Sequence, residues 1–123
     1  MSRIRIAVAA AGVGLVLLPA TPSSGATLPK LVGTVGRNDA FTITLTKAGR
    51  RVTKLKAGRY IVVVRDLSTI HNFHLVGPGV NKATPVGAKV TRTWRLTLKK
   101  GTYRYRCDAP GHAATMKGSF RVT

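Results

Sequence analysis

The sequence predicts an all-β protein, a Greek-key sandwich or barrel built from about seven short strands. Three observations lead to this prediction. Runs rich in β-branched and aromatic residues recur between glycine-containing turns, and apolar and polar residues alternate in several of these runs. No window after residue 26 has the period of an amphipathic helix. The 123 residues are enough for one domain.

The N-terminus resembles a secretory signal peptide. Arg3 and Arg5 supply a positive start, residues 6–18 form an uncharged apolar run, and Pro19 ends it before a stretch of small residues. The run is short beside the ~20 residues that a membrane-spanning helix needs. A retained membrane anchor is the alternative to a cleaved signal.

We expect cleavage after Ala26, because Ser24 and Ala26 fit the small-x-small rule; Ala20 is the other candidate. The chain would then consist of a signal peptide, residues 1–26, and one domain, residues 27–123. We expect the domain to be secreted, periplasmic or held at the cell surface. No membrane span is expected after cleavage.

The first half of the domain contains three expected strands. Residues 31–35 form a short candidate, and residues 41–46 alternate apolar residues with threonine, as a half-buried strand does. Residues 47–50 read as a turn. The continuous apolar run at residues 60–64 predicts a central strand that is covered on both faces.

The second half of the domain contains four more expected strands. We expect strands at residues 71–76, 90–98, 103–107 and 118–122, with a loop over residues 77–87. We expect an antiparallel arrangement of these strands. Two six-residue segments, Leu-Lys-Ala-Gly-Arg-Tyr from residue 55 and Leu-Lys-Lys-Gly-Thr-Tyr from residue 98, echo one another. They predict corresponding corners of two hairpins, each a glycine turn before a strand that starts with an inward tyrosine.

Strand parity gives Cys107 a direction. Tyr103, Tyr105 and Cys107 alternate with Arg104 and Arg106, so the tyrosines and the cysteine share the inward face. Because the tyrosines lie inside, the arginines do not belong to an aromatic platform for nucleic-acid bases. Trp94 and Phe73 are likewise expected to be core residues rather than electron-transfer relays.

A candidate metal-binding loop follows that strand. Cys107, His112 and Met116 are spaced C-x4-H-x3-M, and Cys107 is the only cysteine of the chain. A thiolate, an imidazole and a weak thioether form a soft ligand set that suits copper. Metal ligation also explains how a lone thiol persists in an oxidising compartment. A second imidazole is needed, and His71 and His74 are the candidates.

At this point the sequence resembles the cupredoxins, the small blue-copper proteins. His71-Asn72-Phe73 is similar to the His-Asn-aromatic segment of the family. Residues 107–118, with Pro-Gly before the histidine and Lys-Gly after the methionine, resemble the azurin loop. The resemblance in strand pattern covers nearly all of residues 27–123 and implies a Greek-key sandwich of the cupredoxin type.

The resemblance implies one type-1 copper ion bound by His71, Cys107 and His112, with Met116 as the axial ligand. It also implies that Asn72 ties the two ligand loops together by hydrogen bonds. The chain departs from the azurin pattern in lacking the azurin disulfide cysteines. It also departs at the residue before the first histidine, where azurins have glycine and this chain has isoleucine.

His74 is the alternative upstream ligand. Three residues apart on a strand, His71 and His74 point to opposite faces, so only one of them can share a site with Cys107. The His-Asn match favours His71.

The charge is extreme. The chain has 21 lysines and arginines against 3 acids, a formal net charge of +18, and its acids are Asp39, Asp66 and Asp108. Such a field attracts acidic proteins, anionic cell-surface polymers or nucleic acid. A generic basic surface is the alternative to a dedicated docking face. We expect an acidic redox partner and no specific nucleic acid.

These observations together predict a monomeric electron carrier that uses a single copper ion. A copper-binding carrier or buffer is one alternative, and a metal-free basic β-sandwich that binds anionic polymers is another. An enzyme is not expected, because the sequence offers no carboxylate pair and no glycine-rich phosphate loop. A Cys107–His112 nucleophile pair would have no evident orienting acid beyond Asp108.

Overall fold

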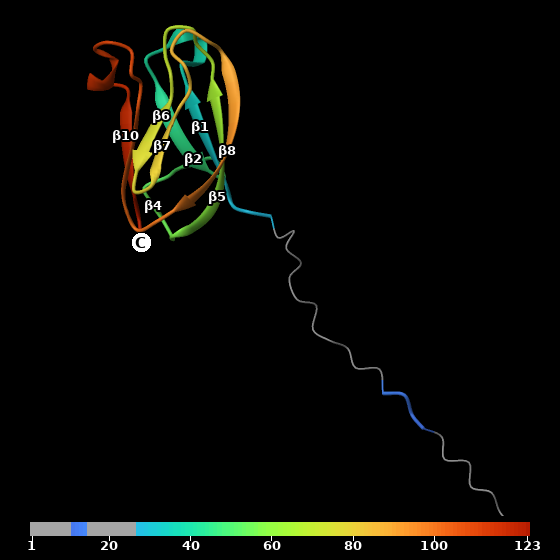
Figure 1. Ribbon diagram of the computed structural model, residues 1–123. Coiled ribbons are helices and arrows are strands. Elements are labelled where there is room, and N and C mark those ends of the chain that lie inside the picture. The colour runs from blue at the N-terminus through green and yellow to red at the C-terminus, as the bar shows by residue number, and fades with distance from the viewer. Residues whose placement is uncertain (1–10, 15–26) are drawn as a thin grey trace, which may run out of the picture.

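The computed structural model describes residues 11–14 and 27–123, so the predicted signal peptide and its cleavage site fall largely outside the described residues. The domain consists of two five-stranded sheets, ordered β3-β2-β1-β5-β8 and β4-β10-β9-β6-β7 (Figure 1). The predicted all-β sandwich is confirmed. Its strands are β1 (Lys30–Val35), β2 (Ile43–Lys47), β3 (Arg50–Arg51), β4 (Lys54–Leu55), β5 (Gly58–Asp66), β6 (His74–Gly77), β7 (Val80–Ala83), β8 (Val90–Leu98), β9 (Gly101–Arg106) and β10 (Lys117–Val122).

The pairing differs from the expected antiparallel arrangement, because both sheets are mixed. β1 pairs with β5 in parallel, and β10 pairs with β4 in parallel, while the other pairs are antiparallel. Alternation of apolar residues reports which face of a strand is buried, not the direction of its neighbour. The sequence pattern therefore could not reveal these two parallel pairs.

Several strand boundaries also differ. β8 has the predicted bounds, but β2 begins two residues later than expected, which leaves Phe41 in a loop. β6 begins at His74 rather than at residue 71, and the predicted 77–87 loop contains β7. The prediction that the 60–64 run is covered on both faces is wrong. Ile61 and Val63 are only half-buried, because no other element of residues 27–123 covers the outer face of the first sheet.

The core lies between the two sheets and is closed by aromatic pairs. The rings of Phe73 and Tyr105 stack with centroids 5.5 Å apart, and those of Tyr103 and Phe120 stack at 5.2 Å. Cys107 is fully buried with them, so the predicted inward face of the 103–107 strand is confirmed.

The two echoing segments are equivalent corners, although they are not hairpins. Each carries the chain from one sheet to the other, since β4 and β5 belong to different sheets, as do β8 and β9. The Tyr60 hydroxyl donates to the Lys56 carbonyl at 2.7 Å, and the Tyr103 hydroxyl lies 3.0 Å from the Lys99 carbonyl. A tyrosine that bonds the backbone a few residues upstream in this way fixes a sandwich corner.

Helical structure is limited to short 3-10 turns among the described residues. These are η1 (Arg37–Asp39) and η2 (His112–Ala114). Within residues 11–14 and 27–123, no helix is long and apolar enough to cross a bilayer.

Candidate metal centre

The loop between β9 and β10 folds back on itself and brings its ends together. The Cys107 amide donates to the Met116 carbonyl at 3.1 Å, and the Met116 amide donates to the His112 carbonyl at 2.8 Å. The turn between them is closed by the His112 amide, which donates to the Ala109 carbonyl at 3.0 Å. Gly111, at φ 79°, occupies the left-handed region that begins η2. The sequence Pro-Gly thus returns His112 to the side of Cys107.

His71 reaches the same place from the loop between β5 and β6. Its ring is fully buried, and its Nε2 lies 3.2 Å from the carbonyl oxygen of Asp39. A carbonyl only accepts, so this contact assigns the ring proton to Nε2 and leaves the lone pair of Nδ1 available. A backbone partner on the far ring nitrogen is a frequent way of orienting a histidine ligand.

Three donor atoms converge here. His71 Nδ1 lies 3.0 Å from His112 Nδ1, and Cys107 Sγ lies 3.8 Å and 3.7 Å from these two nitrogens. One metal ion with bonds of about 2.0 Å to nitrogen and about 2.3 Å to sulfur holds such donors about 3–4 Å apart. The triangle has the size and the chemistry of a mononuclear site, and one thiolate with two imidazoles suits copper.

Met116 completes the predicted set in the same loop. Its side chain is fully buried, and its backbone bonds to both Cys107 and His112. His112 is half-exposed, so the centre lies at the end of the sandwich with one imidazole toward solvent. All four side chains predicted as ligands therefore come from the same region of the fold.

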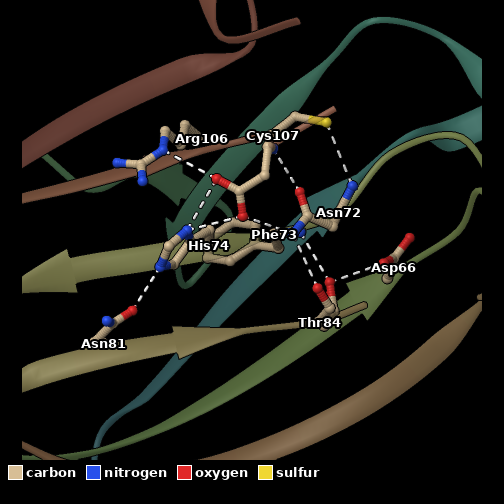
Figure 2. A network of polar contacts seen from close by, with 9 residues as sticks. Asp66, Asn72, Phe73, His74, Asn81, Thr84, Arg106 and Cys107 are labelled. Carbon is tan, nitrogen blue, oxygen red and sulfur yellow. Dashed lines mark hydrogen bonds and ion pairs between the residues drawn. The ribbon is translucent and has the colours of Figure 1, made fainter. Parts of the chain in front are cut away.

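Asn72 ties the two ligand loops together, as the family resemblance implied. Its amide NH donates to Cys107 Sγ at 3.4 Å (Figure 2). Its side-chain amide donates to Asp108 at 3.0 Å and to the Thr84 carbonyl at 2.9 Å, while its Oδ1 accepts from the Asp108 amide. This NH bond fixes the position of the sulfur, as hydrogen bonds to metal ligands commonly do.

His74 lies away from the donor triangle. One ring nitrogen faces the Asp108 carboxylate at 2.8 Å, and the other faces Asn81 Oδ1 at 2.6 Å (Figure 2). Burial acts to raise the pKa of Asp108, but hydrogen bonds from Asn72, His74 and Arg106 outweigh it and hold that pKa below its usual value. His74 therefore contacts the same Asp108 carboxylate to which Asn72 donates a hydrogen bond.

A second buried carboxylate supports the upstream loop. Asp66 accepts from the Thr84 hydroxyl at 2.8 Å (Figure 2). It also accepts from the Ser68 amide at 3.3 Å. The Thr84 hydroxyl in turn accepts from the Phe73 amide at 2.8 Å. Desolvation by burial raises the pKa of Asp66 despite these hydrogen bonds. The network fixes the backbone on both sides of His71 and Asn72.

Sequence reasoning missed Phe41. Its ring centroid lies 4.8 Å from that of His71 and 4.7 Å from that of His112, yet the residue is 56% exposed. It was assigned to the alternating 41–46 strand, where its pattern is that of any inward aromatic. Only the tertiary position of the β1–β2 loop reveals that Phe41 covers both imidazoles.

Comparison with known proteins supports the fold. No family model matches the chain, and no curated protein matches it by sequence. Among solved structures, reduced rusticyanin matches with a TM-score of 0.60 and 20% identity, over 76% of this chain and 78% of that one. Rusticyanin from Thiobacillus ferrooxidans matches with a TM-score of 0.55 and 20% identity, over 76% of each chain.

Auracyanin A, a "blue" copper protein from the green thermophilic photosynthetic bacterium Chloroflexus aurantiacus, matches with a TM-score of 0.51 and 20% identity. This match covers 76% of the present chain and 98% of auracyanin A. The fold of the present chain is therefore the cupredoxin fold. The three side chains that converge, two histidines and one cysteine, together with the buried Met116 of the same loop, are residue types that suit a type-1 copper site.

Proposed function

We propose that this protein is an electron carrier that binds one copper ion through His71, Cys107, His112 and Met116. The observation that carries the proposal is the donor triangle, in which atoms of His71, Cys107 and His112 lie within 4.8 Å of one another. Bound copper would supply a one-electron Cu(I)/Cu(II) couple. The fold similarity to two blue copper proteins supports the same assignment.

The chain's own residues prepare the site for reversible electron transfer. Asn72 and the Asp39 carbonyl orient Cys107 and His71 before any metal binds. Rigid ligands would suit both oxidation states of a bound copper ion without large rearrangement, and the Met116 thioether would supply a weak fourth ligand. Burial of Cys107 and Met116 excludes water from the sulfur side of the site.

The metal end of the sandwich offers an apolar surface for a partner. Within residues 27–123, the exposed large apolar residues are Phe41, Ile70 and Val86, which are 56%, 46% and 48% exposed. They lie in the β1–β2, β5–β6 and β7–β8 loops, which meet at this end. Exposed apolar residues that gather at one end of a protein are typical of an interaction site, and Phe41 contacts both imidazoles. We propose that electrons pass here to a redox partner outside the cytoplasm, and that the net positive charge of the whole chain favours an acidic one.

A copper carrier that hands over the metal is the second candidate, because His112 is half-exposed and could be reached by an acceptor. The two are distinguished by cycling the copper-loaded protein between oxidation states in the presence of an apo copper acceptor. An electron carrier is expected to keep its copper through many cycles and to exchange electrons reversibly. Loss of copper to the acceptor within a few cycles would instead support a protein that delivers copper.

A further inference from the structure

A basic groove of about 660 Å³ lies at the end of the sandwich opposite the donor triangle. β1 and β5 begin at this end and β2 finishes there, whereas Val35 and Asp66 are paired at the metal end. Figure 1 shows β4 and the C-terminus at the foot of the sandwich, with η2 at the top. The cations that line the groove are all exposed: Lys47, Arg50, Arg51, Lys54, Lys56 and Arg59.

No aspartate side chain pairs with these cations in the part of the chain that the structure describes. Asp39 accepts from Ser68, Asp66 is buried with Thr84, and Asp108 pairs with His74 and Arg106. All three acids of the sequence therefore belong to the metal end. Cations that gather within about a Debye length (~10 Å) repel one another, which destabilises the folded state. An anionic occupant would remove that repulsion.

The backbone around the groove is fixed by hydrogen bonds. The residues at and after the end of β10 hold the wall of the groove, since the Ala57 amide donates to the backbone oxygen of Thr123 and the Thr123 amide donates to the Leu55 carbonyl, both at 2.9 Å. Beneath it, Val52 and Leu55 are buried in the core. A backbone that is fixed before binding loses less entropy when a ligand arrives than a flexible one does.

The lining favours a linear polymer of phosphate groups over other anionic partners. Its one aromatic residue, Tyr60, is 5% exposed and bonded to the Lys56 carbonyl, so bases have nothing to stack on. None of the exposed large apolar residues lines it, which disfavours a membrane surface and a protein interface with an apolar centre. Arginine donors match phosphate oxygens, and a concave groove suits a chain.

We infer that this groove binds a linear polyphosphate-type polymer and thereby anchors the protein by the end that leaves the metal centre free. The test measures binding of long-chain inorganic polyphosphate to the purified protein by calorimetry over a range of NaCl concentrations. The groove variant carries Arg50→Gln, Arg51→Gln, Lys54→Gln and Lys56→Gln. A control variant with the same net charge carries Arg65→Gln, Lys82→Gln, Lys89→Gln and Arg92→Gln, all exposed and outside the groove.

The groove variant is expected to bind polyphosphate at least about tenfold more weakly in ~0.1 M salt, with a shallower salt dependence, because it releases fewer counterions. The control variant should stay within about threefold of the parent. Equal weakening in both variants, or in neither, would overturn the assignment. So would tighter binding of oligothymidylate, polyglutamate or phosphatidylglycerol vesicles than of polyphosphate at equal charge. Cys107→Ser should bind polyphosphate as tightly as the parent does, because Cys107 lies at the metal end. A failure to bind copper and a failure to bind polyphosphate are therefore separate results.

Discussion

At the scale of single residues, the site rests on which way a few side chains point. The inward direction of Cys107 was predictable from its alternation with two arginines and two tyrosines, and the structure confirms it. The hydrogen bonds by which Asn72 joins the two ligand loops were implied by the family resemblance and are confirmed at Asp108. The hydrogen bond from Asn72 to the Thr84 carbonyl was not predicted. Phe41 was not predictable, because its role depends on a loop whose path no local pattern encodes.

Phe41→Ala tests the proposed cover over the imidazoles. The substitution removes ring contacts to His71 and His112 from a residue that is 56% exposed, so we expect little change in stability, less than about 1 kcal/mol. We expect a chelator to remove copper several-fold faster, because water and chelator reach the imidazoles more easily. Val86→Ala, on a neighbouring loop and 48% exposed, is the matched control. Unchanged copper release in Phe41→Ala would contradict the proposed role.

Asn72→Ala tests the link between the ligand loops. The substitution leaves the Asp108 amide without its acceptor and the Thr84 carbonyl without its donor inside the protein. We expect a loss of about 1–3 kcal/mol in the free energy of unfolding of the metal-free protein, measured by urea denaturation. Copper affinity should fall about 10–100-fold. Asn81→Ala, at an exposed position that contacts His74, is the control; an equal loss there would refute the link.

At the scale of elements, the site is the product of two loops on a rigid sandwich. The return of His112 to Cys107 follows from a Pro-Gly turn and one 3-10 turn, features that a sequence pattern can indicate. The upstream loop was predicted as part of a strand, but β6 begins only at His74. The buried bonds of Asp66 and Thr84 hold His71 and Asn72 out of the sheet, and such long-range bonds leave no local signature.

Tyr103→Phe tests the corner between β8 and β9. The Tyr103 hydroxyl accepts from the Lys99 amide at 2.8 Å and lies 3.1 Å from the Pro78 carbonyl, in a fully buried site. We expect the variant to lose about 1–3 kcal/mol of stability at neutral pH, because buried polar groups lose their partner. Tyr60→Phe at the equivalent corner should also destabilise. A neutral effect of Tyr103→Phe would show that the corner does not depend on its hydroxyl.

The same variant carries a pH signature. Burial raises the pKa of Tyr103, although the hydrogen bond from Lys99 acts in the opposite direction. The folded state therefore holds this proton more tightly than the unfolded state. The stability that Tyr103 contributes is complete below pH ~10, the unfolded pKa, and is lost as pH rises through the folded pKa. In urea unfolding from pH 8 to 11.5, the gap between parent and variant should shrink above pH ~10; a constant gap would contradict this linkage.

At the scale of the whole molecule, the fold separates the three acids from one group of cations. The formal net charge of +18 follows from the sequence. Where the charged side chains lie on the surface does not, because it depends on the fold. Folding places the three acids at the metal end and a six-cation groove at the other. The sandwich itself was predictable from alternation, whereas the parallel pairings of β1 with β5 and of β4 with β10 were not.

The groove charges are expected to destabilise the isolated protein. In 10 mM salt the variant with Arg50, Arg51, Lys54 and Lys56 changed to Gln should melt at a higher temperature than the parent, because like charges are removed. The difference should narrow in ~0.5 M NaCl, where the Debye length is short. The control variant, which has the same net charge but is changed outside the groove, should show a smaller rise in melting temperature. A groove variant that melts lower at low salt would contradict the mutual repulsion of these cations.

The central claim is that His71, Cys107, His112 and Met116 bind one copper ion in a type-1 site. The most direct measurement is the optical and EPR spectrum of the Cu(II)-loaded protein, recorded beside Cys107→Ser, His71→Ala and His74→Ala. We predict an intense blue thiolate-to-copper band that is lost in Cys107→Ser and His71→Ala and retained in His74→Ala. A protein that gains no blue band with Cu(II), or one whose band survives His71→Ala but not His74→Ala, would contradict the assignment.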